Sequence, residues 1–397
     1  MSKMAQLAMD APLLVPRTRH QDAALRTRTL RDACAFAELW DPIQALRKQL
    51  QLEDDVSLNP LYFLATTDHV RRPCAVACWR GDRLIGVLFA TERHVRGFRS
   101  GYGLGGDYTG RGLLLCAPQD EAVVIAASVQ ALMADGLHSL HLRMLLRDQT
   151  RMELPGMRAT FLDARVLGDR IALPSSFEQY LRTLGKHTRR NVRYYTRKTV
   201  AAGIQFEQDL AEQEYETSVA RLNAETDFPA NERRLARDRR LLMLNGGTRR
   251  FGLRGPDGVM VAVLCGFTRR KRFHLLTQLN DAHLQRLSLS VVLRGYVIQH
   301  LIDTGHTELQ YMGGSSLSLG RFCKPQQYRS LIVDRKTGVA AVGKSLGSWM
   351  VKFAARIGKP LPVAVQTLCR GFLDESSLSI STALGPSAVA MRPEAND

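Results

Sequence analysis

The stretch from residue 175 to residue 203, SSFEQYLRTLGKHTRRNVRYYTRKTVAAG, carries most of the information about the fold. The run Ser175-Ser176-Phe177-Glu178 has the S-x-x-E spacing of a capping box, in which the serine oxygen accepts from a free amide of the first turn and the glutamate reaches back. A second, strongly basic helix is expected from Lys186 to Val200, with Gly203 ending it. The stretch therefore predicts two consecutive helices.

The basic helix has a stripe of arginines. Arg189, Arg193 and Arg197 recur every four residues and share one face, whereas Val192 and Tyr195 suit the inner face. Such a stripe is either hydrated or in contact with anions, and the pattern leaves both readings open. Arg189 and Arg193 are candidate residues for binding an anionic substrate.

Composition limits the class of protein. The 397 residues are 45% hydrophobic and carry a formal net charge of +17, which indicates a globular chain that meets phosphates, anionic lipid or another acidic ligand. Seven cysteines without a CxxC pair predict neither a metal site nor a disulfide framework, and favour a cytoplasmic location. The longest charge-free apolar run, Ala122 to Ala134, is too short to span a bilayer.

The order helix, strands, helix, strand occurs twice along the chain. A hairpin is expected at residues 74–90 and a three-stranded meander at 250–279, and the best helix of the chain is expected at 288–303. This repetition predicts two tandem α/β units. The expected divisions are a disordered lead (1–21), a first unit (22–155), a second unit (156–338), an amphipathic helical extension (339–380) and a disordered tail (381–397).

Several familiar motifs are incomplete. Gly101, Gly103 and Gly106 spell GxGxxG, but the following residues predict another strand instead of the helix that a dinucleotide site needs. His138 and His141 fall on opposite faces of a strand, which is wrong for joint metal ligation. Neither a nucleotide cofactor of that type nor a metal is expected.

An anion site is expected where the meander leads into the best helix. Backbone N–H groups converge there with the positive end of the helix dipole. The residues of this segment are Gln285, Arg286, Leu287, Ser288, Leu289 and Ser290.

Several ordered blocks of the sequence resemble a known family. They are SFEQYL (176–181) followed by KHTRRNVR (186–193), LQYMGG (309–314) with RFCK (321–324), and NPLYF (59–63) with GDRLIGVL (81–88) in the first unit. These blocks resemble the CelD-type acetyltransferases of the GNAT superfamily, a tandem arrangement shared with the Fem-type aminoacyltransferases. The resemblance implies an α/β fold of two tandem GNAT-like (acyl-CoA N-acyltransferase) units, with mixed, mostly antiparallel sheets flanked by helices.

The resemblance also implies where the acyl donor binds. Residues 285–290 stand in register with the Q/R-x-x-G-x-G/A loop by which GNAT enzymes hold the pyrophosphate of acyl-CoA. Ser288 and Ser290 replace its glycines, and their side chains crowd the close approach that glycine permits. The first unit is expected to have a degenerate site and to shape the acceptor cleft.

The implied reaction is transfer of an acyl group, acetyl foremost, from acyl-CoA to an amino group of a sugar, lipid or cell-envelope polysaccharide precursor, without a metal. Such transfer needs a base, a donor to the carbonyl oxygen and a proton source for the thiolate. The candidate bases are Glu225, Asp227 and His274, and the candidate acid is Tyr311, with Tyr296 as its alternative. Arg321 and Lys324 are candidates for holding the acceptor or the donor.

Two alternatives stay open. An aminoacyl-tRNA-dependent Fem-like transferase would place the basic helix on RNA, and a decayed acyltransferase fold would bind an anionic polymer or membrane without catalysis. Residues 339–357 resemble a basic amphipathic helix. The favoured interpretation is that this helix packs on the acyltransferase core. The alternative is that it lies on the anionic inner face of the membrane.

Overall fold

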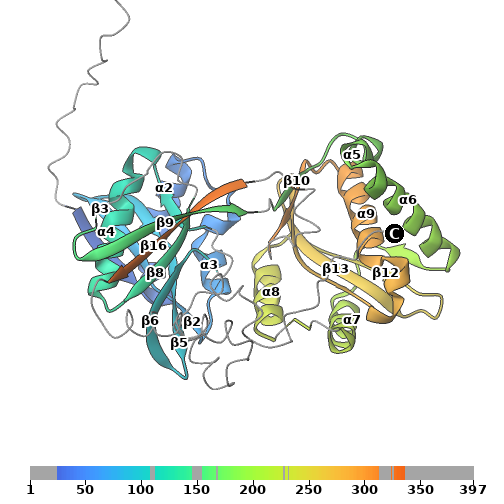
Figure 1. Cartoon of the computed structure of the whole chain (residues 1–397), viewed down its shortest axis with the longest axis horizontal. Coiled ribbons are helices and arrows are strands. Elements are labelled where there is room, and N and C mark those ends of the chain that lie inside the picture. Colours follow the sequence, from blue (N-terminus) through green and yellow to red (C-terminus); the bar gives the residue numbers. More distant parts are fainter. Residues whose placement is uncertain are drawn as a thin grey trace, which may run out of the picture.

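The computed structural model describes residues 25–107, 112–144, 154–166, 169–226, 229–230, 232–312, 323 and 326–335. Two α/β units lie side by side in it (Figure 1). The expected lead, helical extension and tail all lie outside the described residues.

The first unit contains two sheets. Their strand orders are β1-β3-β4-β7 and β2-β5-β6-β8-β16-β9. The strands are β1 (Leu25–Leu30), β2 (Arg71–Pro73), β3 (Ala75–Arg80), β4 (Arg83–Leu88), β5 (Ala90–Val95), β6 (Phe98–Gly105), β7 (Leu114–Cys116), β8 (Ser139–Met144), β9 (Met157–Val166) and β16 (Gln326–Arg335). The helices are α1 (Ala33–Glu38), α2 (Trp40–Gln49), α3 (Pro60–Thr66) and α4 (Glu121–Ala134), with short 3-10 turns η1 (Val56–Leu58) and η2 (Pro118–Asp120).

The second unit has one six-stranded sheet, in the order β10-β15-β14-β13-β12-β11. The strands are β10 (Arg170–Ala172), β11 (Gln205–Glu207), β12 (Thr248–Arg254), β13 (Met260–Arg269), β14 (Arg272–Asn280) and β15 (Glu308–Tyr311). The helices are α5 (Phe177–Thr183), α6 (Lys186–Ala201), α7 (Glu212–Glu225), α8 (Glu232–Leu244) and α9 (Leu289–Asp303), which the 3-10 turn η3 (Ala282–Leu287) precedes.

Helices cover both faces of this sheet. Residues of α5, α6 and α9 form one apolar cluster with sheet residues such as Phe251 and Phe273. Residues of α7 and α8 form another cluster with Phe267 and Leu276. The expected α/β class, with mixed and mostly antiparallel sheets flanked by helices, is confirmed.

The two expected helices of the opening stretch are present. Ser176 caps α5 by accepting from the amide of Gln179 at 3.2 Å. The capping serine is therefore one residue later than Ser175, and Glu178 does not complete a capping box, because it is the second residue of the helix and its carboxylate accepts from Arg193 of α6 at 2.6 Å. The basic neighbour offers the carboxylate a charged partner, and this bond ties α5 to α6.

Each unit contains one parallel strand pair that a helix connects. In the first unit β6 and β8 are parallel and α4 lies between them in the sequence. In the second unit β14 and β15 are parallel and α9 lies between them. The repeated order that the sequence predicted is therefore also a repeated topology.

The chain crosses between the units twice. The predicted boundary assigned residues 156–338 to the second unit, but β9 and β16 pair with each other, and β16 also pairs with β8. Both strands therefore complete a sheet of the first unit. No strand is predicted in either segment from the sequence, and alternating hydrophobicity carries no information about which sheet a strand joins.

Candidate functional site

The start of α9 has free backbone donors. Ser288, between η3 and α9, has left-handed angles (φ 46°, ψ 47°), and its carbonyl accepts from Val291 and Val292 at 2.9 and 3.2 Å. Its side chain makes no capping hydrogen bond. Within the described part of the chain, nothing accepts from the amides of Leu289 and Ser290. These amides are the orphan donors that a helix start offers to a ligand.

This turn is open to solvent and has no carboxylate on it. None of residues 282–287 is buried, Ser288 and Ser290 are half-buried, and the first turn of α9 contains no acidic residue. Asp281 accepts from the amide of His283 at 2.7 Å, so it caps η3 instead. No carboxylate of the described residues therefore occupies the positive end of the α9 dipole, which is available to an external anion.

The corresponding helix of the first unit differs in this respect. Asp120 precedes α4 and Glu121 is its first residue. Asp120 pairs with Arg80 at 3.0 Å. Two carboxylates at this helix start repel an anionic ligand.

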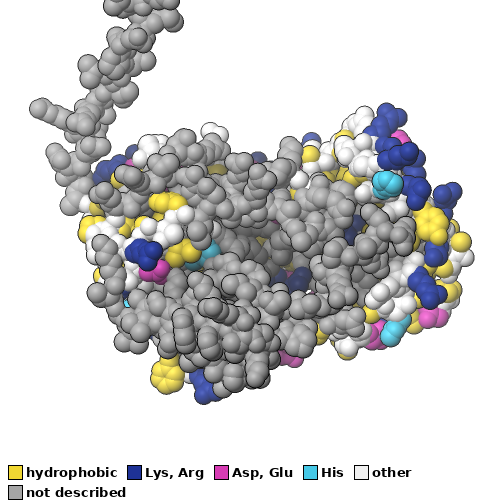
Figure 2. Space-filling model, viewed as in Figure 1, with side chains coloured by type: hydrophobic (Ala, Val, Ile, Leu, Met, Phe, Trp, Pro, Cys, Tyr) yellow, Lys and Arg dark blue, Asp and Glu magenta, His cyan; other side chains and the backbone are white. Residues whose placement is uncertain are grey.

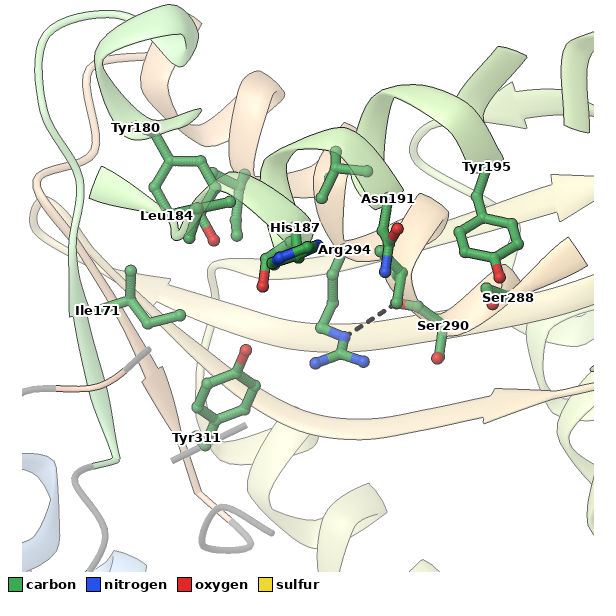
Figure 3. Close-up of a pocket in the computed structure, with 15 residues that line it drawn as sticks. Ile171, Tyr180, Leu184, His187, Asn191, Tyr195, Ser288, Ser290, Arg294 and Tyr311 are labelled. Atoms are coloured by element: carbon green, nitrogen blue, oxygen red, sulfur yellow. Dashed lines mark hydrogen bonds between the residues drawn. The ribbon is translucent and has the colours of Figure 1, made fainter. Parts of the chain in front are cut away.

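A pocket of about 430 Å³ lies beside the start of α9 (Figure 3). It is bounded by α5, α6 and α9 and by the ends of β10 and β15. Its lining residues are Ile171, Tyr180, Leu184, His187, Thr188, Asn191, Val192, Tyr195, Ser288, Ser290, Val291, Arg294, Gly295, Ile298 and Tyr311.

The pocket lies where two parallel strands part. β14 pairs with β15 only from Arg272 to Leu275, whereas it continues beside β13 as far as Asn280. The last bond across the pair is that from the Met312 amide to the Leu275 carbonyl, at 2.8 Å. Tyr311 therefore stands at the point of separation, with its side chain in the pocket.

Two phenols of the pocket, those of Tyr180 and Tyr311, have pKa values above the ordinary value of tyrosine. Burial raises the pKa of Tyr311, an effect that Arg294 partly opposes. Burial likewise raises the pKa of Tyr180. Tyr311 thus carries its proton at neutral pH, as a proton donor must.

The six predicted donor-binding residues have different surroundings. Ser288 and Ser290 line the pocket, while the side chain of Leu289 is buried and only its amide is offered. Gln285 and Arg286 are exposed, and the carbonyl of Arg286 accepts from Lys198 of α6 at 3.2 Å. Leu287 packs against the core of the second unit.

The candidate catalytic residues are not all together. Tyr311 lines the pocket, but His274 stacks on Phe267 on the sheet face that α7 and α8 cover. Glu225, at the end of α7, pairs with Arg221 at 2.9 Å. Asp227, Arg321 and Lys324 lie outside the described residues.

The pocket uses a different face of α6 from the arginine stripe. Arg189 and Arg193 do not line it, whereas His187, Asn191 and Tyr195 do. These three also recur every four residues, so the periodicity that marked the arginines could have identified them. Dark blue side chains line the edge of the molecule where α6 lies (Figure 2).

Arg294 was not anticipated from the sequence. It belongs to α9, and its Nε donates to the carbonyl of Ser290 at 2.9 Å (Figure 3). The signal was present, because Arg294 is the single Lys, Arg, Asp or Glu between Leu289 and Ile302 in an otherwise mainly apolar helix.

The described residues show neither a metal site nor a membrane-spanning helix. They contain no group of three or more His, Cys, Asp or Glu residues arranged to hold a metal ion. No helix among them is long and apolar enough to cross a membrane.

One stretch of the chain matches the sequence model of a known protein family. Residues 186–320 match the acetyltransferase (GNAT) domain. This stretch runs from the start of α6 past the end of β15, so it contains the start of α9 and the parting strands. The expected GNAT fold is thereby confirmed for the second unit.

Solved structures with similar architecture include FemX, with 10% identity, a TM-score of 0.48 and coverage of 71% of this chain and 95% of that one. A tandem GNAT protein from the clavulanic acid biosynthesis pathway has 10% identity, a TM-score of 0.45 and coverage of 79% and 99%. L-PGS from Bacillus licheniformis has 12% identity, a TM-score of 0.44 and coverage of 76% and 93%. No curated protein matches the sequence.

Proposed function

We propose that the second unit transfers an acyl group from acyl-CoA, acetyl-CoA foremost, to an amino group. The observation that carries the proposal is the pair of free amides at Leu289 and Ser290, which open onto a pocket where β14 and β15 part. The match of residues 186–320 to a GNAT acetyltransferase domain supports it. A pyrophosphate at these amides would point the rest of the carrier into the pocket.

In the proposed reaction, the amine attacks the thioester carbonyl carbon, a C–N bond forms, and the C–S bond breaks. Tyr311 supplies the proton that the leaving thiolate takes, because it lines the pocket and its raised pKa keeps it protonated. The proton that the amine nitrogen gives up goes to Glu225 or His274 as base, which requires an acceptor that approaches from the face of α7 and α8. Asp227, two residues after Glu225, belongs to the same proposal.

The finer parts of the proposal concern the acceptor and the location. We place the enzyme in the cytoplasm, with a sugar, lipid or cell-envelope precursor as acceptor and with the first unit shaping the acceptor cleft. The carboxylates at the start of α4 support a degenerate first site. The CelD-type relationship and the roles of Arg321 and Lys324 belong to the same proposal.

The test is binding followed by turnover. Acetyl-CoA at one hundred times its dissociation constant should raise the free energy of unfolding by about 2.7 kcal/mol, which a thermal melt detects. Release of free CoA thiol should then depend on an added amine, with amino sugars and aminolipids compared. Absence of any thermal shift with CoA or acetyl-CoA would contradict the proposal.

The role of Tyr311 has its own test. Tyr311→Phe should lower kcat by about a hundredfold or more while the dissociation constant of acetyl-CoA stays the same. Tyr296→Phe is the matched variant, because Tyr296 stacks on Phe206 and does not line the pocket. A larger loss in Tyr296→Phe than in Tyr311→Phe would reverse the assignment.

One observation favours the aminoacyl-tRNA alternative. The outer face of α6 exposes Arg190, Arg193, Tyr194 and Arg197, a combination of cations and an aromatic ring that suits RNA. Binding of tRNA whose affinity falls steeply with salt would favour that donor. Binding of acidic polymers or anionic vesicles without any acyl transfer would instead favour the non-enzymatic alternative.

A further inference from the structure

Arg294 stands inside the pocket without an acidic partner. It is half-buried, its Nε donates to the carbonyl of Ser290, and its side chain also contacts the Tyr311 side chain. No Asp or Glu lines the pocket, and among the described residues no carboxylate pairs with this guanidinium. A half-buried charge of this kind is costly unless an anion accompanies it.

The orientation of the guanidinium suits a ligand. Because Nε is bonded to the Ser290 carbonyl, the side chain is held at its base, and its terminal nitrogens stay on the pocket side, where they meet the Tyr311 side chain. In Figure 3 they point toward Tyr311, away from α6. Two parallel N–H donors on one guanidinium are the geometry that carboxylate and phosphate groups accept best.

Its place in the pocket indicates which molecule brings the anion. Arg294 follows Ser290 by four residues, so it lies one helical turn, about 5.4 Å, further along α9. A donor with its pyrophosphate at the Leu289 and Ser290 amides therefore passes Arg294 on the way to Tyr311.

We propose that Arg294 binds an anionic oxygen group of the acyl donor, separate from the group held by the amides of Leu289 and Ser290. This inference rests on the proposed function. Two sources carry the same chemistry: a phosphate of the carrier, or a carboxylate at the far end of a dicarboxylic acyl chain. Arg294 is a donor-binding residue in either case, and it determines acyl specificity where its ligand is the carboxylate.

The experiment measures dissociation constants by titration calorimetry on the full chain. The ligands are CoA, butyryl-CoA and succinyl-CoA, of which the last two differ mainly in a terminal carboxylate. The variants are Arg294→Met, Arg294→Lys and, as control, Arg239→Met, which removes an equal charge from α8 on the opposite face of the sheet, where Arg239 pairs with Glu216. Arg294→Lys keeps the charge but not the paired donors, and it replaces Arg294→Met if that variant does not fold.

Two supporting outcomes distinguish a phosphate of the carrier from a carboxylate of the acyl chain. A loss of ten- to hundredfold in Arg294→Met for all three ligands, with Arg239→Met within twofold of wild type, supports the inference and identifies a carrier phosphate. If Arg294→Met loses affinity only for succinyl-CoA, so that succinyl-CoA no longer binds more tightly than butyryl-CoA, the result supports the inference and identifies a carboxylate.

The results that would contradict the inference differ from those that would contradict the proposed function. Wild-type affinity of Arg294→Met for all three ligands overturns the inference and leaves the proposed function standing, since CoA still binds. Failure of wild type to bind any of the three overturns the proposed function, and the inference with it.

Discussion

Arg233 on α8 donates to both carboxylate oxygens of Asp68, at 2.7 to 2.9 Å, and so bonds the second unit to the first. Asp68 also accepts from the amides of Val70 and Arg71, each at 2.8 Å. Burial acts to raise the pKa of Asp68, but these amides and Arg233 outweigh it, and the pKa lies below its ordinary value. The carboxylate is therefore stabilised in its charged form at the contact between the units.

Replacing Arg233 should weaken this contact in a pH-dependent way. Because the folded-state pKa of Asp68 is depressed, its stabilising contribution is present above the unfolded pKa of about 4 and is lost as the pH falls through the lower folded value. Arg233→Met should therefore cost about 1 kcal/mol near neutral pH, and the difference from wild type should shrink below pH 4 or so. Melting temperatures from pH 7 to pH 3 measure it.

The control for this prediction removes a charge without a partner. Arg190 of α6 is exposed and makes no bond to another described residue, so Arg190→Met should have little effect at any pH. A difference between Arg233→Met and wild type that stays constant down to pH 3 would show that Asp68 is not the linked group.

Ser288→Gly should both stabilise the protein and tighten donor binding. A left-handed backbone costs a residue with a Cβ roughly 1 kcal/mol, and glycine avoids this cost while allowing a closer approach to the amides. The matched control is Gln51→Gly, since Gln51 is exposed in the first unit and also has a positive φ of 56°. We expect a higher melting temperature for both variants and tighter acetyl-CoA binding for Ser288→Gly alone. Equal affinities in the two variants would contradict the proposed approach at Ser288.

Ser290→Asp should change stability and binding in opposite directions. A carboxylate in the first turn of α9 interacts favourably with the helix dipole, by about 0.3 to 1 kcal/mol, and it imitates the acidic start of α4. The same carboxylate would occupy the place of the anion and lower the affinity for CoA at least tenfold. Ser290→Asn, which has nearly the same shape without the charge, is the control. A Ser290→Asp variant that binds CoA as wild type does would place the anion site elsewhere.

Local features of this chain could be predicted from the sequence because they depend on neighbouring residues. The start of α5 at the serine pair Ser175-Ser176 is recognisable from spacing alone, and so is the turn that leads through Ser288 into α9. The free amides at the start of α9, which require only a helix start without acids, fall in the same class.

Features that depend on tertiary packing could not be predicted in this way. His274 looked like a candidate base, but strand register turns it toward Phe267, away from the pocket. Arg294 stands out as the single charged residue between Leu289 and Ile302, but only the arrangement of α6 and β15 around it makes it part of a pocket. Strand pairing across long stretches of sequence, as in β16, is outside what periodicity can specify.

The pairing of β16 predicts that the first unit depends on residues that follow the second. Leu331 and Val333 are fully buried in the apolar cluster of the first unit, beside Leu140 of β8. Leu331→Ala should therefore cost about 2 to 5 kcal/mol, whereas Ile332→Ala, at a half-buried position on the other face, should cost less.

A chain that ends at residue 322 lacks β16 altogether. It leaves β8 and β9 without their shared partner, because β16 is bonded to both of them and they are not bonded to each other. We expect hydrogen exchange in this shortened chain to rise first in β8 and β9 and only later in β12 and β13, which keep all their partners. Unchanged protection of β8 in the shortened chain would mean that the first unit folds without β16.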